Sequence, residues 1–274
     1  MKIESVRSWI ALLMLGVLAS CSTVPVTGRR QLNMVSDPAI MSMSLQQYGD
    51  FLKTHTLSTD AEQTAKIRKV GHRIQKGVEN YFARIGMQSE LDGYQWEFNL
   101  VEGKEINAFC MPGGKVVVYT GLLPVARDDN GLAVVMGHEI AHAVAKHGNE
   151  RMSQALAMEM GGVALGVAMS NESGQSRQLW TMVYGMGATV GYMLPFSRLH
   201  ESEADHLGLI FMALAGYDPH TAVDFWQRMA GIKGGKTPPE FLSTHPSDQT
   251  RIEAIKEYIP EAMTYYRPKD IPAG

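Results

Sequence analysis

One five-residue motif, His138-Glu139-Ile140-Ala141-His142, constrains this chain more than any other part of its sequence. In an α-helix each residue turns by roughly 100°, so side chains four positions apart lie about 40° apart and one turn along the axis. The imidazoles of His138 and His142 can therefore reach a single metal ion, and the Glu139 carboxylate lies beside them on the same face. A carboxylate in that position can act as a base for water without being a ligand.

The residues around this motif have the composition of a buried helix. Asp128 and Asp129 are typical of a helix start, and Gly148 is typical of a helix end. Between these signals the chain is largely apolar, at Leu132, Val134, Val135, Met136, Ile140, Ala143 and Val144. The pattern predicts a buried helix over about residues 130 to 147, and it disfavours two histidines that merely cap or pack.

A second acidic motif lies on another expected helix, which Pro195 precedes and Gly216 follows. Glu201 and Asp205 are four residues apart and share one face of that helix, whereas Glu203 points elsewhere. We interpret Glu201 as the third protein ligand of the metal, which leaves one coordination position open. Asp205 then fits the role of a hydrogen-bond acceptor that fixes the tautomer of one ligand histidine.

Other zinc-ligand schemes can be tested by their spacing. The long metzincin pattern requires glycine at position 145 and histidine at position 148, where this chain has Ala145 and Gly148, so that class is excluded. His147 lies five residues beyond His142, about 140° round the helix. We expect His147 to be a surface or helix-end residue and not a ligand.

Taken together, the two motifs resemble those of a known family. They match the gluzincin zinc metallopeptidases of the HtpX and CAAX-prenyl-protease family, and the chain looks most like the bacterial lipoprotein and periplasmic members such as LoiP and BepA. The matching residues are His138-Glu139-x-x-His142, Ser197-Arg198-x-x-Glu201-x-Glu203-Ala204-Asp205, Pro25-Val26-Thr27-Gly28-Arg29-Arg30-Gln31, Asn107-Ala108-Phe109, Gly113-Gly114-Lys115, Tyr119-Thr120-Gly121 and His245-Pro246. The resemblance spans nearly all of the mature chain and carries the ligand and base roles over residue for residue.

The resemblance implies an α+β fold that is mostly helical, a zincin-like catalytic domain with a small mixed sheet whose edge strand lies over the metal cleft. In gluzincins this strand pairs with the extended substrate backbone, so the resemblance places Asn107, Ala108 and Phe109 at the substrate. The same residues, followed by a Gly-Gly pair, fit an ordinary hairpin equally well. We interpret Cys110 as a packing residue, because nothing near it marks a nucleophile.

Hydrolysis of an amide also requires a donor for the oxyanion that forms on the carbonyl. His245 is the candidate, because it precedes an expected helix and is fixed by the proline that follows it. Two roles are open: His245 polarises the tetrahedral intermediate, or it ligates zinc in a resting form and blocks the site. Arg198 and His200 are weaker candidates, because each can simply pair with a neighbouring carboxylate.

The N-terminal residues have the pattern of a secretory signal. Lys2 and Arg7 precede an apolar run, residues 10 to 18, that is short for a bilayer span. Leu-Ala-Ser then precedes Cys21, which resembles a bacterial lipobox and predicts that Cys21 is lipidated; an ordinary signal peptide is the alternative. By resemblance to Gram-negative sorting rules, Ser22 in place of aspartate favours the outer membrane.

Composition bounds the remaining organisation. Beyond a signal peptide over residues 1–20, we expect an extended leader over 21–36 and one metallopeptidase domain over 37–274. Cys21 and Cys110 are the two cysteines, so lipidation of the first leaves no internal disulfide. The formal charge of −3 gives no electrostatic case for binding nucleic acid. With 29 residues after His245, the tandem helical repeats of some relatives are expected to be absent.

Periodicity predicts mostly helix and little strand. Strands are expected over 94–101 and 115–119, and a capping box, Thr59-Asp60-Ala61-Glu62, is expected to begin a helix that reaches Ile85. Two apolar stretches, 155–169 and 179–196, are interpreted as buried or cleft-covering helices and not as membrane spans, because glutamate or glycine interrupts each. The other helices are expected over residues 37–53, 130–147, 150–169, 178–193, 198–215, 219–230 and 247–258.

These predictions describe a membrane-anchored endopeptidase with one Zn²⁺ per chain. Acylated Cys21 would hold it to the lipid bilayer at the periplasmic face of the outer membrane, and its expected partners are unfolded or misassembled envelope polypeptides. Protein quality control is what the resemblance implies. The alternative is an outer-membrane assembly factor or holdase in which proteolysis is secondary. A hydrolase of non-peptide substrates is disfavoured, because an edge strand recognises polypeptide.

Overall fold

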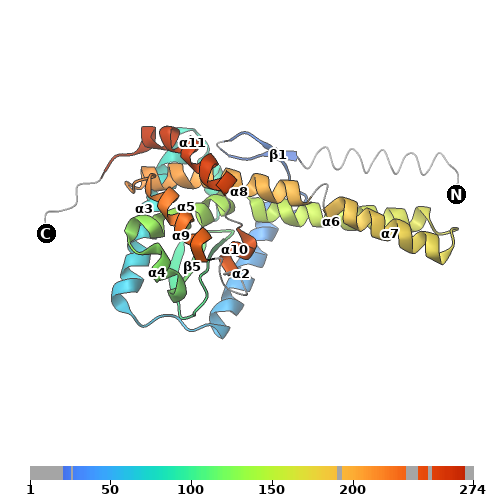
Figure 1. Cartoon of the computed structure of the whole chain (residues 1–274), viewed down its shortest axis with the longest axis horizontal. Helices are drawn as coiled ribbons and strands as arrows, with labels where there is room; N and C mark the ends of the chain where they lie inside the picture. The colour runs from blue at the N-terminus through green and yellow to red at the C-terminus, as the bar shows by residue number, and fades with distance from the viewer. Residues whose placement is uncertain (1–20, 26, 190–192, 233–239, 246–248, 269–274) are drawn as a thin grey trace. The chain divides into compact units, whose positions relative to one another are not determined.

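The computed structural model describes residues 21–25, 27–189, 193–232, 240–245 and 249–268 (Figure 1). The expected signal peptide and Pro246 lie outside the described residues. The chain divides into two compact units, a smaller one of Met1–Ile40 and Lys146–Leu199 and a larger one of Met41–Ala145 and His200–Gly274. Helices dominate and one small mixed sheet is present, so the predicted fold class, α+β and mostly helical, is confirmed.

The sheet of the larger unit contains β3 (Glu97–Val101), β4 (Ala108–Met111) and β5 (Lys115–Tyr119) in the order β3-β5-β4. β3 runs parallel to β5 and β4 runs antiparallel to it. Between β4 and β5, Gly113 and Gly114 have φ angles of 88° and 82°, a conformation that glycine adopts without steric cost. The strand that begins after Asn107 is thus both one arm of a Gly-Gly hairpin and an edge of the sheet.

Helices of the larger unit surround α5 (Asp129–Val144), the helix that carries the two histidines. The side chain of Asp128 caps its start by accepting a hydrogen bond from the Gly131 amide, 2.9 Å away. α5 packs against α3 (Ala61–Arg84), α9 (Thr221–Gly231) and β4. The remaining elements are α2 (Asp37–Thr54), η1 (Gln88–Leu91), η2 (Thr120–Leu122), α4 (Leu123–Ala126), α8 (Leu194–Leu214), α10 (Glu240–Thr244) and α11 (Gln249–Tyr265).

The smaller unit contains a short hairpin and a long one. β1 (Cys21–Thr23) pairs with β2 (Arg30–Leu32), so the leader is partly a strand pair and not simply extended. β2 packs against α6 (His147–Ala168), where Arg29 forms a bidentate ion pair with the buried Glu150 at 2.7 and 3.0 Å. α7 (Gly174–Ala188) returns along α6, and together they form the second hairpin.

The prediction that the two apolar stretches are buried is wrong in the residues that the structure describes. α6 and α7 expose large apolar side chains to solvent instead of burying them, and α7 has no buried residue at all. Among the described residues, no helix has both the length and the apolar character needed to cross a membrane. Apolar periodicity therefore located these helices correctly but did not reveal that their large apolar side chains are exposed.

Candidate metal centre

Four side chains of the larger unit converge on one point. Ligand atoms of His138, His142, Glu201 and His245 all lie within 4.8 Å of one another, and this cluster could hold one metal ion. α5 presents the two histidines one turn apart, α8 presents the glutamate, and His245 follows α10 directly. The structure thus brings together the three residues that spacing singled out as ligands and adds the fourth.

Two glycines allow the helices to approach closely enough for this convergence. A Cβ atom on Gly208 of α8 would lie 2.9 Å from the backbone nitrogen of His138, and one on Gly137 of α5 would lie 2.9 Å from the carbonyl oxygen of Gly208. Real side chains do not tolerate such contacts, so any larger residue would separate the helices. The close crossing brings Glu201, two turns before Gly208, to the histidines.

The distances between the ligand atoms fit a tetrahedral zinc site. The Nε2 atoms of His138 and His142 lie 3.1 Å apart, and the Glu201 carboxylate oxygens lie 3.3 and 3.2 Å from them respectively. Zinc ligands about 2.0 to 2.1 Å from a tetrahedral ion are separated by roughly 3.3 Å. Two imidazoles and a carboxylate that meet through lone pairs also need a cation or protons between them, so the donor set fits Zn²⁺.

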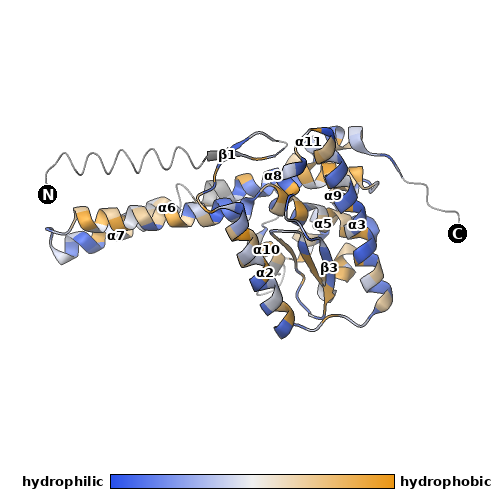
Figure 2. Ribbon diagram, turned by 180° about the vertical axis from the view of Figure 1, so that it is seen from behind, coloured by the Kyte–Doolittle hydropathy of each residue, from blue (hydrophilic) through white to orange (hydrophobic). Residues whose placement is uncertain are grey.

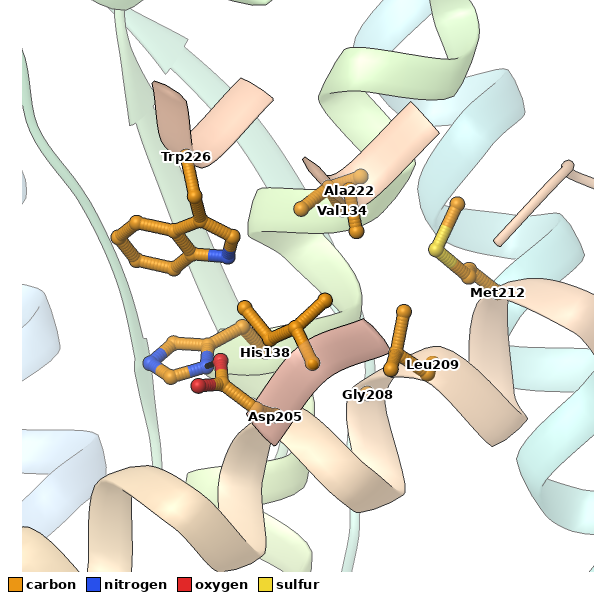
Figure 3. A pocket seen from close by; sticks show the side chains of 9 residues that line it. Val134, His138, Asp205, Gly208, Leu209, Met212, Ala222 and Trp226 are labelled. Carbon is orange, nitrogen blue, oxygen red and sulfur yellow. Dashed lines mark ion pairs between the residues drawn. The ribbon is translucent and has the colours of Figure 1, made fainter. Parts of the chain in front are cut away.

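A second layer of polar side chains holds His138 in place. Its Nδ1 lies 2.9 Å from Asp205 Oδ1 (Figure 3). The other ring nitrogen, Nε2, therefore faces the cluster, 3.1 Å from Nε2 of His142. Arg251 of α11 in turn donates two hydrogen bonds to the same carboxylate, of 2.7 and 2.8 Å, and its guanidinium lies 3.5 Å from the centre of the Trp226 ring. Such outer partners orient a ligand histidine and raise its basicity.

Burial and neighbouring charges act in opposite directions on the pKa values of the cluster. Burial alone would lower the pKa of His138, but hydrogen bonds to Asp205 and Glu201 outweigh it and raise that pKa to about 9. Burial would raise the pKa of Glu201, yet the three histidines hold it well below its usual range; Arg251 does the same for Asp205. Both carboxylates are therefore ionised at neutral pH, and a metal ion must displace the proton on His138.

The carboxylate of Glu139 lies at the edge of the cluster. It is buried, and its Oε1 lies 3.5 Å from Nε2 of His245, the ring atom turned away from the other ligands. Strand β4 runs along the same helix face, and the Cys110 thiol is close enough that burial and the Glu139 charge together raise its pKa. A thiol with a raised pKa is a poor nucleophile, which agrees with a packing role for Cys110.

The residues expected at the substrate lie at the start of β4. Asn107 precedes the strand; its carbonyl accepts a hydrogen bond from the Tyr119 amide at 3.1 Å, and its side chain accepts one from the Ala108 amide at 2.9 Å. Phe109 packs against Phe51, with ring centres 5.2 Å apart, so its side chain contributes to the sheet's apolar cluster.

Other candidates lie outside the cluster, and one important residue was missed. His147 is buried at the start of α6, His200 is buried on α8, and Arg198 is exposed; none of the three belongs to the four-residue cluster. Arg251 was not predicted. In the sequence, Arg251 stands next to Ile252 and near Ile255, which are buried on α11. That a basic residue faces inward with them becomes clear only when the helix is placed in the fold.

Comparisons with known proteins agree with this geometry. Residues 69–259 match the model of Peptidase family M48. The chain is 35% identical over 242 residues to the mitochondrial metalloendopeptidase OMA1 of Schizosaccharomyces pombe, covering 88% of this chain and 67% of that protein. Its identity to the Saccharomyces cerevisiae protein of the same name is 30% over 287 residues, covering 97% and 78%. The beta-barrel assembly-enhancing protease of Escherichia coli is 30% identical over 165 residues, covering 57% of this chain and 33% of that protein.

Proposed function

Because the chain belongs to peptidase family M48 and is a zinc metalloendopeptidase, we propose that His138, His142 and Glu201 hold its zinc ion and that Glu139 is the base. The observation that carries this proposal is the convergence of the three ligands, with spacings of 3.1 to 3.3 Å. When bound, zinc supplies Lewis acidity, which polarises a carbonyl and makes water a stronger acid.

Glu139 moves the proton in this mechanism. Its carboxylate takes a proton from the attacking water as the new C–O bond forms, and it returns that proton to the nitrogen as the C–N bond breaks. Cleavage first gives a carboxylic acid and an amine; the remaining proton of the acid then passes to the amine, so a carboxylate and an ammonium group leave and Glu139 ends as it began. Because the side chain is buried, few waters compete for the proton.

The edge strand β4 is the proposed substrate site. Within the described residues β4 pairs with β5 on one side, and its other backbone edge has no strand partner. An extended substrate can add to that edge through main-chain hydrogen bonds, which read backbone and tolerate many sequences. Because β4 packs against α5, a bound strand would run beside Glu139 and the metal ligands.

His245 is proposed to be the fourth ligand in a resting state. Its Nδ1 lies 2.9 Å from both carboxylate oxygens of Glu201 and 3.2 Å from Nε2 of His138. In this place the His245 ring would take the coordination position that a substrate carbonyl needs. This geometry supports the blocking role over the oxyanion role, because an oxyanion donor stands beside the reacting carbonyl and does not replace it.

Replacing His245 by alanine is therefore expected to raise peptide turnover by several-fold while zinc content stays at one ion per chain. The physical reason is that three ligands remain and the fourth corner opens to water and substrate. Cleavage of an unfolded protein substrate and metal analysis of the same samples check this. A large loss of turnover with normal zinc content would instead assign His245 to the oxyanion.

We further propose that the enzyme is a lipoprotein of the bacterial envelope, attached through acylated Cys21 at the periplasmic face of the outer membrane, that degrades unfolded or misassembled envelope proteins. The lipobox-like residues before Cys21 support the anchor. The names of two relatives, a metalloendopeptidase and a beta-barrel assembly-enhancing protease, support the protease part of this proposal. The Escherichia coli name also favours the second candidate, an assembly factor or holdase in which proteolysis is secondary.

Comparing the envelope proteomes of cells that carry the wild type or Glu139→Gln tests the choice. If the chain is a quality-control protease, a set of envelope proteins accumulates in the variant and their fragments disappear. If assembly is the main role, the outer-membrane proteins assemble normally in the variant, because binding does not need the base. For any one outer-membrane protein, loss of its fragments with accumulation of the intact protein supports the protease role, and normal assembly without accumulation supports the assembly role.

A further inference from the structure

The α6–α7 hairpin presents one apolar stripe on each helix. On α6 the exposed apolar side chains recur at intervals of four, three and four residues, so they fall on one face. On α7 the helical period also places the exposed apolar side chains on one side of the helix. Figure 2 shows apolar residues along both helices. The stripes consist of Leu156, Met160, Val163 and Val167 on α6, and Leu179, Trp180, Met182, Val183 and Met186 on α7, which are 38% to 69% exposed.

The hairpin does not use these stripes for its own packing. α6 and α7 meet where the Tyr184 hydroxyl donates a hydrogen bond to the carbonyl of Met158, 3.0 Å away, and where the absence of a side chain at Gly161 leaves room for the same hydroxyl. On each helix those positions lie across the axis from the stripe. Two helices that leave their largest apolar side chains in water gain little from burial, so the stripes indicate a binding surface.

The charge of the hairpin indicates what kind of surface it meets. Between residues 152 and 189 the chain has three charged side chains, Glu159, Glu172 and Arg177. Glu172 and Arg177 lie between the two stripes, and the formal charges of the three side chains add to −1. Such a segment has no electrostatic attraction to acidic headgroups or to a charged protein, so its affinity must come from apolar burial.

The position of the chain's start indicates which apolar partner is within reach. The described residues begin at Cys21, the first residue of β1, and β2 packs against α6 in the same compact unit. Beyond the Arg29–Glu150 ion pair, the Met34 amide donates to Ser153 at 2.8 Å and Asn149 donates to the Val35 carbonyl at 2.9 Å. Residues 29–35 are therefore bonded to the first turns of α6, in the same unit as Cys21.

Taking the proposed acylation of Cys21 as given, we infer that the α6–α7 hairpin is a second membrane contact. It lies in the interfacial layer of the bilayer that holds the lipid anchor, with its apolar stripes against acyl chains and its polar connection among the headgroups. Trp180 suits that layer, because its ring is apolar and its indole nitrogen can donate to a headgroup. A lipid and a hairpin in one unit fix that unit's orientation, which a lipid alone cannot do.

Quenching of Trp180 by brominated acyl chains tests this inference on the full chain. Wild type and Trp180→Phe are bound to phosphatidylcholine vesicles with and without bromine, and the difference between the two proteins isolates Trp180 from the other tryptophans. We expect strong quenching of this difference signal, unchanged between low and high salt. The double variant Val167→Asp, Val183→Asp should remove most of it, because each charge weakens partitioning by about tenfold or more. Ile85→Asp, at a similarly exposed apolar residue of the larger unit, should leave it unchanged.

The outcomes separate this inference from the proposed function. Vesicle-bound protein without quenching of Trp180 overturns the hairpin contact and leaves the anchor standing, whereas protein absent from the vesicles overturns both. If the aspartate variant instead abolishes self-association in sedimentation, or capture of a reduced, unfolded polypeptide, with quenching unchanged, the stripe binds a second copy or a client and not lipid. Cleavage of a short peptide in the same samples should stay within about twofold of the wild type, because the variants lie outside the catalytic machinery.

Discussion

Glu139→Gln is expected to lower peptide turnover by about a hundredfold to ten-thousandfold with zinc still bound at one ion per chain. The amide has the shape of the carboxylate but cannot accept a proton from water at neutral pH. Glu139 is buried beside the cluster and its Oε1 is 3.5 Å from His245, so the substitution removes the base without removing a proposed ligand. Single-turnover cleavage of an unfolded substrate, with metal analysis of the same protein, measures both quantities.

A matched control is Glu62→Gln, which changes an exposed glutamate in the first turn of α3. It makes the same chemical change at a residue outside the cluster, so turnover should stay at the wild-type level. Full activity in Glu139→Gln would refute the base role. Loss of zinc in that variant would show that Glu139 supports the metal site and that the loss of turnover has another cause.

The features of the site that could be predicted are those set by one helix at a time. The period of an α-helix fixes which side chains share a face, so the sequence was sufficient to pair His138 with His142 and Glu201 with Asp205. Apolar periodicity also located most helices to within a few residues. At the start of α3, however, Asp60 and not Thr59 is the cap, and it accepts a hydrogen bond from the Gln63 amide at 3.0 Å. Both residues are good caps, and local sequence does not choose between neighbours.

What could not be predicted depends on how elements meet. The ion pair between Arg251 and Asp205 joins residues that are 46 positions apart, and no local pattern encodes it. The exposure of α6 and α7 is similar: their composition is that of buried helices, and only the arrangement of the chain shows that their stripes are uncovered. The close crossing of α5 and α8 needed glycines at both Gly137 and Gly208, whose meaning appears only when the two helices are placed together.

The other prediction with a large effect concerns the residue that joins the two helices at the cluster. Glu201→Gln should weaken zinc binding by about a hundredfold or more, because total zinc affinities of 10 to 16 kcal/mol are shared among about four ligands and 1.4 kcal/mol is tenfold. Turnover should be lost at low zinc and partly restored by excess zinc. Chelator competition measures the affinity, and Glu203→Gln on the same helix, outside the cluster, should bind zinc as the wild type does.

A measurement on the metal-free protein separates the ligand role of Glu201 from a merely structural one. The Glu201 carboxylate lies 3.3 Å from Nε2 of His138 and stabilises the charged imidazolium, as does Asp205 on the other ring nitrogen. These contacts raise the pKa of His138 to about 9 against the effect of burial. Removing one negative charge must therefore lower that pKa in the Gln variant, and a pH titration of the ring by NMR would show it. An unchanged pKa together with unchanged zinc affinity would mean that Glu201 does not face the metal. A lowered pKa with weakened binding would show that the same charge holds the proton in the empty site and the zinc in the filled one.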